Sequence, residues 1–382
     1  MRIGVNTRLL LHGKMDGIGW FTYETLSRIV VSHPEHQFYF FFDRKPDPRF
    51  FFASNVHPIV LCPQARHPLL WILYFEVSMK CALKKHQIDF LFSPECYIPL
   101  RLGIPTLSVF HDLNYEHAKD YLKPSHQMYM DYFSRRFAGG STRIATVSTY
   151  SKQDIVDTYQ IDPNKVDVVY NGANEGYRPL SLEEQRMTRA RFSQGARYFI
   201  FIGTILKRKN LSTLLKSFDR FKATDKEGIK LLVVGNRVWW QDELEAEYNA
   251  MKYQKDVVFI GRAPQEDLFK LLGSSIALVY PSLFEGFGIP ILEAYNAEVP
   301  VVTSNCTSMP EVAGGAAVLV EPTDSLAIAA AMERIAKDPL FCANLVEKGR
   351  EQRKRFSWDI TANKLWESMM KTLSARRNNE KE

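Results

Sequence analysis

Residues 274–303 constrain the fold of this chain more than any other stretch of its sequence. They read SSIALVYPSLFEGFGIPILEAYNAEVPVVT. Residues 276–280 have the length and residue types of a buried strand, residues 299–303 predict a second strand, and residues 291–296 show a short helical pattern. This order predicts a strand, a glycine loop, a helix and another strand. The loop precedes a helix start, where backbone amides and the helix dipole can receive an anion or hydroxyl groups.

Two carboxylates, Glu285 and Glu293, are the chemical signal of this stretch. Glu285 lies in the glycine loop, and Glu293 is expected in the first helical turn, with Pro290 as the first helical residue. Gly286 and Gly288 have no side chains where a ligand would lie against the backbone, so Glu285 could accept hydrogen bonds from sugar hydroxyls. Glu293 could bind a ribose diol. The structural alternative is that Glu293 complements its helix dipole and that the glycines form a turn. The whole string EGFGIPILEA favours the binding site.

The string EGFGIPILEA and the VPVVTSNCTSMPEVAGGAAVLVEP that follows it resemble the donor-site region of the retaining family 4 glycosyltransferases, which carry an E-x7-E motif. The resemblance implies the α/β fold called GT-B, in which two Rossmann-like domains face each other across a cleft and a C-terminal helix crosses back onto the first domain. It also implies a nucleoside-diphosphate sugar as the donor. Within the family, the chain resembles mannosyltransferases and related enzymes of bacterial surface-polysaccharide and lipopolysaccharide assembly.

The length of 382 residues suits two domains. We expect an acceptor-side Rossmann-like domain at residues 1–176, joined by a C-terminal helix at 358–375. Residues 177–196 are expected to be a linker, and residues 197–357 a Rossmann-like domain that binds the nucleotide sugar.

Composition and charge limit the class of protein and the cellular compartment that fit this sequence. The formal charge of +6, from 49 basic and 43 acidic residues, is compatible with an anionic nucleotide sugar or membrane surface but argues against a nucleic-acid-binding protein. The five cysteines have no metal-binding spacing, and the N-terminus does not resemble a signal peptide. We therefore expect a cytoplasmic enzyme that can work at the inner face of the cell membrane.

A glycine loop follows the first predicted strand, residues 2–6. It carries Gly17 and Gly19, and a helical pattern begins at Trp20. The loop resembles the family's N-terminal G-x-G loop, which borders the cleft near the donor phosphates or the acceptor. The alternative is a plain turn between strand and helix.

The strand predicted at residues 106–110 ends directly in His111 and Asp112. Polar residues at the carboxyl end of a strand in an open α/β sheet lie where ligands bind. In the family this position faces the sugar and the phosphate, so the resemblance implies a catalytic contact for His111 and a cleft position for Asp112.

Bases follow the strand predicted at residues 198–203. The segment from Gly203 and Thr204 to Arg208 and Lys209 resembles the family's G-T-x-x-x-R-K-N motif, in which Arg208 and Lys209 would serve the phosphates. A diphosphate gathers charge as its glycosidic bond breaks, and fixed cations in a cleft stabilise that charge. Some family members have arginine where this chain has Thr204, so the share carried by Arg208 stays open. The structural alternative is a solvated basic run.

Two further predicted strands, 231–235 and 257–261, end in glycine, and by resemblance their loops border the nucleobase pocket. The residues predicted for catalysis are Glu285, Lys209, Arg208 and His111. The residues predicted for donor binding are Glu293, Phe287, Gly288, Ile289, Gly203, Thr204, Gly235, Gly261 and Arg262. No D-x-D motif is present, and we expect neither a metal nor a cofactor besides the nucleotide-sugar co-substrate, which would be linked to GDP or UDP.

Residues 68–85 combine an apolar stretch with lysines near its end. Such a helix could lie at a membrane interface with its lysines towards anionic lipid. The alternative is a core helix whose lysines complement the C-terminal dipole.

The sequence thus predicts a retaining, nucleotide-sugar-dependent hexosyltransferase, with mannose as the preferred sugar and a saccharide or lipid-linked saccharide as acceptor. Two alternatives stay open: a GT-B phosphorylase or epimerase, and a non-catalytic protein that binds nucleotide sugars.

Overall fold

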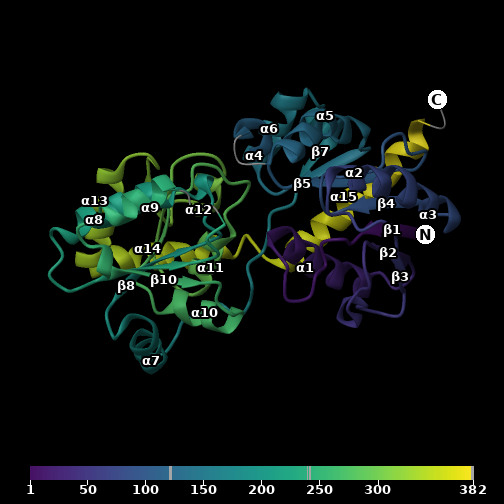
Figure 1. Ribbon diagram of the computed structural model, residues 1–382. Helices are drawn as coiled ribbons and strands as arrows, with labels where there is room; N and C mark the ends of the chain where they lie inside the picture. The colour runs from purple at the N-terminus through teal and green to yellow at the C-terminus, as the bar shows by residue number, and fades with distance from the viewer. Residues whose placement is uncertain (120–122, 239, 241, 380–382) are drawn as a thin grey trace. The chain divides into compact units, whose positions relative to one another are not determined.

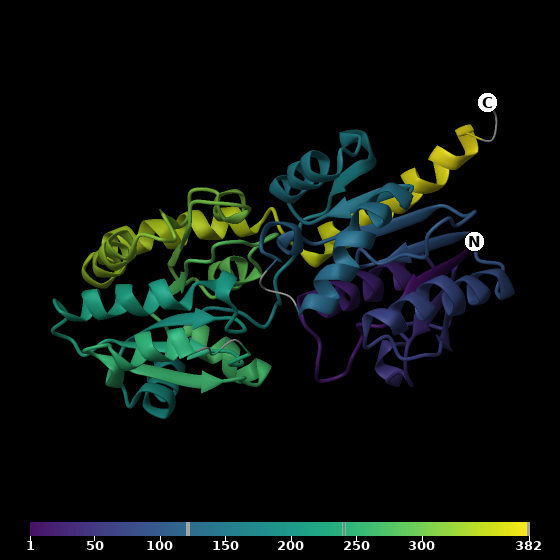
Figure 2. The same ribbon diagram turned by 45° about the horizontal axis from the view of Figure 1, so that its top comes forward.

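The computed structural model describes residues 1–119, 123–238, 240 and 242–379, the last five of them as backbone only. The chain forms two compact units (Figure 1). The first contains residues 1–171 and the C-terminal helix from Trp358, and the second contains residues 172–357. Each unit is a parallel β-sheet with helices packed on both faces (Figure 2). This arrangement confirms the predicted pair of Rossmann-like domains.

The first unit has a seven-stranded parallel sheet in the order β3-β2-β1-β4-β5-β6-β7. Its strands are β1 (Arg2–Asn6), β2 (Gln37–Phe42), β3 (Val56–Val60), β4 (Phe90–Ser93), β5 (Thr106–Phe110), β6 (Arg143–Thr146) and β7 (Val166–Val168). Its main helices are α1 (Gly17–Ser32), α4 (Asn114–His117), α5 (Pro124–Gly140), α6 (Thr149–Tyr159) and α15 (Trp358–Asn379).

The predicted helix at 68–85 is one continuous helical rod in the first unit. It consists of α2 (Pro68–Ile72), a π-helical segment η2 (Leu73–Met79) and α3 (Lys80–Lys85).

The second unit has a six-stranded parallel sheet in the order β10-β9-β8-β11-β12-β13. Its strands are β8 (Tyr198–Ile202), β9 (Lys230–Val234), β10 (Val257–Gly261), β11 (Leu278–Tyr280), β12 (Val301–Ser304) and β13 (Val318–Val320). Its helices are α7 (Leu182–Ser193), α8 (Leu211–Lys222), α9 (Asp242–Asn249), α10 (Gln265–Gly273), α11 (Ile289–Asn296), α12 (Met309–Ala313), α13 (Ser325–Lys337) and α14 (Pro339–Arg353), with a short 3₁₀ turn η5 (Lys207–Lys209) after β8.

Burial on both faces explains why the central strands read as continuous apolar runs. All five residues of β8, YFIFI, are buried, and so are all five of β5, TLSVF. The strand order reverses between β1 and β4 in the first sheet and between β8 and β11 in the second. Loops at the carboxyl ends of these strand pairs lie where open α/β sheets bind ligands.

The C-terminal helix α15 belongs to the first unit, as the predicted fold requires. Leu365 and Met369 of α15 are fully buried, and Ser368 donates a hydrogen bond of 2.7 Å to Asp167. Arg28 of α1 pairs with Asp359 at 2.6 Å. Residues 177–196, expected as a linker, contain α7, and the boundary between the units lies between Asn171 and Gly172.

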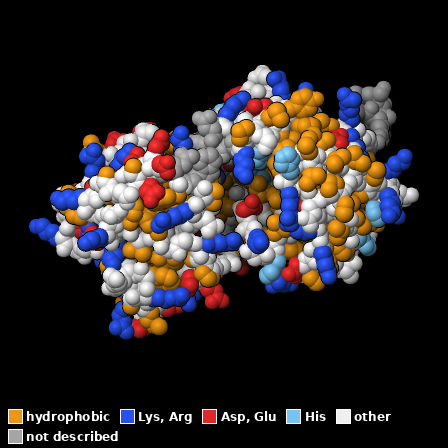
Figure 3. All heavy atoms as spheres, viewed as in Figure 1, with side chains coloured by type: hydrophobic (Ala, Val, Ile, Leu, Met, Phe, Trp, Pro, Cys, Tyr) orange, Lys and Arg blue, Asp and Glu red, His pale blue; other side chains and the backbone are white. Residues whose placement is uncertain are grey.

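Surface charge and hydropathy give two further observations. On the face seen in Figure 3, Lys and Arg side chains are spread over both units instead of forming one continuous basic surface. Within the part of the chain that the structure describes, no helix is both long enough and apolar enough to cross a membrane.

Candidate functional site

A cluster of one buried carboxylate and two partly buried cations lies at the strand reversal of the second sheet. Arg208 and Lys209 follow β8, and Glu285 follows β11. Arg208 Nη1 lies 2.9 Å from Glu285 Oε2, and Lys209 Nζ lies 2.5 Å from Glu285 Oε1. The exposed fractions of the three side chains are 18%, 11% and 9%. The structure therefore brings together three of the predicted catalytic residues.

Tyr280, the last residue of β11, completes the cluster. Its hydroxyl donates a hydrogen bond of 2.9 Å to Glu285 Oε1, and Lys209 donates to the same hydroxyl. From its glycine neighbours we expected Glu285 to be an unoccupied acceptor. Its oxygens instead already contact Arg208, Lys209 and Tyr280. Three of its roughly four acceptor positions are taken, which leaves one on Oε2 for a further donor.

The cations control the charge of Glu285. Burial alone would raise the pKa of this carboxyl group, but the charges of Arg208 and Lys209 and the hydrogen bonds from Lys209 and Tyr280 outweigh burial and lower the pKa to about 2. Burial and the adjacent carboxylate raise the pKa of Tyr280 well above its ordinary value. Glu285 is therefore ionised and Tyr280 protonated at neutral pH, and with both cations the cluster keeps one net positive charge.

Backbone contacts hold the loop of Glu285 in place. Ser308 donates hydrogen bonds to the carbonyl oxygens of Glu285 (2.9 Å) and Phe287 (3.0 Å). Arg208 Nη1 donates to the carbonyl oxygen of Phe284 at 3.1 Å. Phe287 is 4% exposed and packs edge-on against Phe356 with ring centroids 5.7 Å apart. The loop before α11 is consequently fixed from both sides.

The start of α11 differs from the prediction. Gly288 is the N-cap with φ +102°, so glycine is required there by the backbone conformation. Ile289 is the first helical residue and Pro290 the second. Glu293 is therefore the fifth residue, in the second turn of the helix and not in the first. The error arose because the helix begins at Ile289, one residue before Pro290, which was predicted as the first helical residue.

Glu293 has an environment of its own. Burial raises the pKa of its carboxyl group to about 7, and a hydrogen bond with Tyr177 limits the rise. Tyr177 lies in the second unit and packs edge-on against Phe269 at 4.5 Å. No cation lies within ion-pair distance of Glu293 among the described residues. The two glutamates of the motif thus differ in pKa: neighbouring cations lower the pKa of Glu285, whereas burial raises that of Glu293.

The predicted glycines lie in a row at the carboxyl edge of the second sheet. Gly203 donates its N–H to Val234, and Gly235 donates its N–H to Gly261. A Cβ on Gly235 would lie 2.0 Å from the carbonyl oxygen of Gly203, so no larger residue fits. Thr204 and Arg262, which follow two of these glycines, are exposed.

His111 and Asp112 lie in the first unit, directly after β5 as predicted. His111 contacts the carbonyl oxygen of Pro94 at 2.9 Å and packs edge-on against Phe21 at 4.9 Å. Burial lowers its pKa, so the imidazole is neutral at neutral pH. Asp112 accepts hydrogen bonds from the N–H and the side-chain amide of Asn114, at 3.1 and 2.6 Å.

Gly17 and Gly19 are helical residues, and the prediction that they form a loop was wrong. Helix α1 begins at Gly17, capped by Asp16, whose side chain accepts from the N–H of Gly19 at 2.9 Å. A Cβ on Gly19 would lie 2.9 Å from the carbonyl oxygen of Leu9, whereas a Cβ on Gly17 would meet nothing within 4 Å. Gly19 therefore allows close packing of the preceding loop on the helix.

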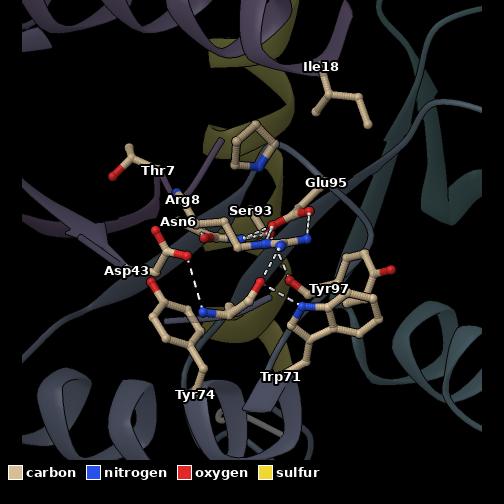
Figure 4. A network of polar contacts seen from close by, with 12 residues as sticks. Asn6, Thr7, Arg8, Ile18, Asp43, Trp71, Tyr74, Ser93, Glu95 and Tyr97 are labelled. Carbon is tan, nitrogen blue, oxygen red and sulfur yellow. Dashed lines mark hydrogen bonds and ion pairs between the residues drawn. The ribbon is translucent and has the colours of Figure 1, made fainter. Parts of the chain in front are cut away.

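A second buried ion pair, which the sequence analysis missed, occupies the strand reversal of the first sheet (Figure 4). Arg8 follows β1 and Glu95 follows β4. The carboxylate accepts two bonds from Arg8, both 2.5 Å, and one of 2.6 Å from Asn6. Figure 4 shows the guanidinium group close to aromatic rings, and its centre lies 4.9 Å from the ring centroid of Tyr97. The sequence signal was available, since all three polar residues stand at the ends of apolar strands.

The described residues include no group of three or more His, Cys, Asp or Glu side chains arranged to hold a metal ion.

Two family models match the chain. The model described as "Glycosyltransferase Family 4" matches residues 16–176, and the model described as "Glycosyl transferases group 1" matches residues 183–352. The first segment contains β4 and Glu95 of the strand reversal of the first sheet but not β1 or Arg8, and the second contains the Arg208–Lys209–Glu285 cluster.

Similar proteins and structures agree with these matches. O-antigen chain mannosyltransferase B of Escherichia coli is 28% identical over 362 residues, which cover 90% of this chain and 93% of that protein. O-antigen chain mannosyltransferase RfbU of Salmonella typhimurium is 26% identical over 71% of this chain and 72% of its own. The structure of Anabaena HepE in complex with UDP and glucose has a TM-score of 0.75 at 15% identity and covers 97% of this chain and 100% of its own. A glycosyltransferase from Rickettsia africae has a TM-score of 0.73 at 16% identity, with 97% and 98% coverage. The chain therefore belongs to the family 4 glycosyltransferases, with the GT-B fold.

Proposed function

We propose that this glycosyltransferase transfers a hexose, preferably mannose, from a nucleoside-diphosphate sugar to a saccharide or lipid-linked saccharide, with retention of anomeric configuration. The reaction would serve the synthesis of a surface polysaccharide or lipopolysaccharide. The observation that carries the donor assignment is the buried Arg208–Lys209–Glu285 cluster at the strand reversal of the second sheet. The two mannosyltransferases named above support the choice of sugar.

The cluster suits a leaving diphosphate. The negative charge of the diphosphate rises as its bond to the anomeric carbon breaks and that carbon takes on oxocarbenium character. Arg208 and Lys209 are held in place before the reaction by Glu285 and Tyr280, so little reorganisation is needed when that charge develops. Glu285 would in addition accept a sugar hydroxyl at the remaining position on Oε2.

Other residues would position the donor. Glu293 would hold the ribose diol, and the amides of Phe287, Gly288 and Ile289 at the start of α11 would contact the sugar. The row of Gly203, Gly235 and Gly261, with Thr204 and Arg262, would border the phosphates and the nucleobase.

The first unit would take the acceptor, with His111 and Asp112 after β5 and the start of α1 on its ligand side. We assign no protein base, because the departing phosphate can accept the proton of the acceptor hydroxyl in a retaining reaction. We likewise assign no metal and no cofactor besides the nucleotide sugar.

The test begins with a thermal-shift screen of GDP- and UDP-linked sugars. A ligand at about one hundred times its dissociation constant should stabilise the protein by about 2.7 kcal/mol. The donor found in this way is then incubated with the protein and a lipid-linked oligosaccharide, and the anomeric configuration of the product is read by NMR. The proposal predicts transfer of mannose with retention. Hydrolysis or isomerisation of the donor without acceptor would indicate a phosphorylase or epimerase instead, and donor binding without transfer to any acceptor would indicate a binding protein.

A further inference from the structure

The outer face of the helical rod 68–85 exposes an apolar strip. Leu69, Leu73 and Val77 are 67%, 49% and 53% exposed. Their spacing of four residues puts them on one side of the rod. The opposite side is core, since Trp71, Tyr74, Phe75 and Met79 are at most 8% exposed. The rod is therefore apolar on both sides, and the part of the unit that the structure describes leaves the outer side exposed.

Helix α5 extends this strip. Met128 and Tyr132, one turn apart, are 72% and 56% exposed. The two helices are joined beneath the surface by aromatic packing, since Trp71 of α2 lies edge-on to Tyr129 of α5 at 5.1 Å. Within α5, Tyr129 also stacks on Phe133 at 4.5 Å. We call the five exposed residues, Leu69, Leu73, Val77, Met128 and Tyr132, the α2–α5 surface.

This concentration is unusual for the chain. The α2–α5 surface holds five of the fifteen exposed large hydrophobic side chains among the described residues. In Figure 3, hydrophobic side chains gather over the part of the first unit where Figure 1 labels α2 and α5, with Lys and Arg side chains around them. A contiguous exposed apolar surface marks a binding site for a protein or a membrane.

The positive charge around the α2–α5 surface favours a membrane over a protein as the partner. Arg101, Arg135 and Arg136 are exposed, and among the described residues none of the three has a carboxylate within ion-pair distance. A hollow between the rod and α5 is lined by Lys80, Arg101, Tyr132 and Arg136, with Glu76. Glu76 is itself paired with Lys80 at 2.5 Å. Apolar side chains bordered by cations match a bilayer with anionic headgroups.

We propose that the α2–α5 surface docks the enzyme on a membrane that contains anionic phospholipid. The apolar side chains insert among the acyl chains, and Arg101, Arg135 and Arg136 contact headgroup phosphates. The proposal deepens the proposed function in one respect, since a lipid-linked acceptor would lie in such a membrane. Docking itself requires neither donor nor acceptor.

The test is flotation of the full-length protein with vesicles of phosphatidylcholine alone or of phosphatidylcholine and phosphatidylglycerol in equal parts. The wild type should float with the anionic vesicles and much less with the neutral ones, and added salt should weaken binding. Leu73→Glu/Val77→Glu should weaken binding by at least about a hundredfold. Arg135→Gln/Arg136→Gln should weaken it roughly thirtyfold, from about a tenfold loss per 1.4 kcal/mol and about 1 kcal/mol per cation.

Two double variants at other positions of the chain serve as controls, one for replacing apolar side chains by glutamate and one for removing positive charge. Leu182→Glu/Leu340→Glu replaces two leucines of the second unit, each 84% exposed, and should bind vesicles like the wild type. Arg186→Gln/Lys354→Gln changes the charge equally and should also bind normally. A thermal shift with donor verifies folding of every variant and is independent of docking. The proposal is overturned if the wild type binds neither vesicle, if it binds both equally, or if the α2–α5 variants bind no more weakly than their controls.

Discussion

Glu285 differs from an ordinary surface carboxylate because it is buried between two cations. Removing one member of such a cluster leaves the others uncompensated, a cost of roughly 3–5 kcal/mol in buried pairs. Replacing Glu285 should therefore lower both the stability of the second unit and the rate of glycosyl transfer.

Glu285→Gln tests this interdependence. The amide keeps the shape but leaves Arg208 and Lys209 without a counter-charge, so the free energy of unfolding of the second unit should fall by about 3 kcal/mol. A bound nucleoside diphosphate should recover part of the loss, and glycosyl transfer should be at least a hundredfold slower. Chemical denaturation with and without GDP or UDP measures the changes in stability, and Glu266→Gln, at an exposed position of α10, is the control. Unchanged stability and activity would contradict the cluster's role.

Glu293 predicts a dependence of stability on pH. Its pKa is about 7 in the folded protein, above its ordinary value of 4.5. The folded state therefore keeps a proton that the unfolded state releases. The free energy of unfolding falls as the pH rises from 4.5, the ordinary pKa, through about 7, the pKa in the folded protein. The loss is about 3 kcal/mol by linkage. Unfolding at about pH 5 and about pH 8 should show this loss in the wild type and not in Glu293→Gln, whereas Glu298→Gln should behave like the wild type. An equal loss in Glu293→Gln would exclude Glu293 as the cause.

At the scale of elements, the sequence predicted most central strands because burial on both faces leaves an unmistakable apolar run. It did not predict β3, VHPIV, which contains a proline and lies at the sheet edge with only one buried residue. Helix starts were less accurate. Neither Gly17 nor Ile289 belongs to the apolar pattern that marked α1 and α11, and only their caps define the true starts.

The candidate site was predictable where motif and topology coincide, as at Arg208, Lys209 and Glu285. The partners that control it were not. Tyr280 is only five residues from Glu285, but its apolar strand marked it as a core residue, and Tyr177 meets Glu293 only through folding of a distant segment. For Arg8 and Glu95, the polar residues at the strand ends marked a ligand-binding edge, but the pairing itself could not be predicted because the two residues are 87 positions apart.

The two glycines at the start of α1 should respond oppositely to alanine. Gly17→Ala adds a methyl group in open space and should be neutral or stabilising by up to about 1 kcal/mol. Gly19→Ala forces a Cβ against the Leu9 carbonyl and should destabilise by about 1–3 kcal/mol. Thermal unfolding of both variants measures the difference. Loss of transfer activity in stable Gly17→Ala would instead indicate that a ligand approaches this glycine closely.

At the scale of the whole molecule, each unit has a buried Arg–Glu pair at the reversal of its sheet, and the chain returns at its end to the first unit. The stability of that unit should therefore depend on residues more than 350 positions from its first strand. Leu365→Ala in α15 should cost about 3 kcal/mol, because Leu365 is fully buried. Hydrogen exchange should show the loss in β5 and β6, on which α15 packs. Loss of protection in β8 and β9 instead would contradict the assignment of α15 to the first unit.

The central claim is that the corner of Arg208, Lys209 and Glu285 binds the diphosphate of the donor. Lys209 and Lys207 lie in the same turn after β8, but Lys209 is paired with Glu285 whereas Lys207 is exposed. Calorimetric titration with GDP and UDP compares Lys209→Ala with Lys207→Ala. We predict that Lys209→Ala weakens binding of the preferred diphosphate by roughly tenfold to a hundredfold, with Lys207→Ala close to the wild type. Equal affinity of both variants, or a greater loss in Lys207→Ala, would contradict the claim.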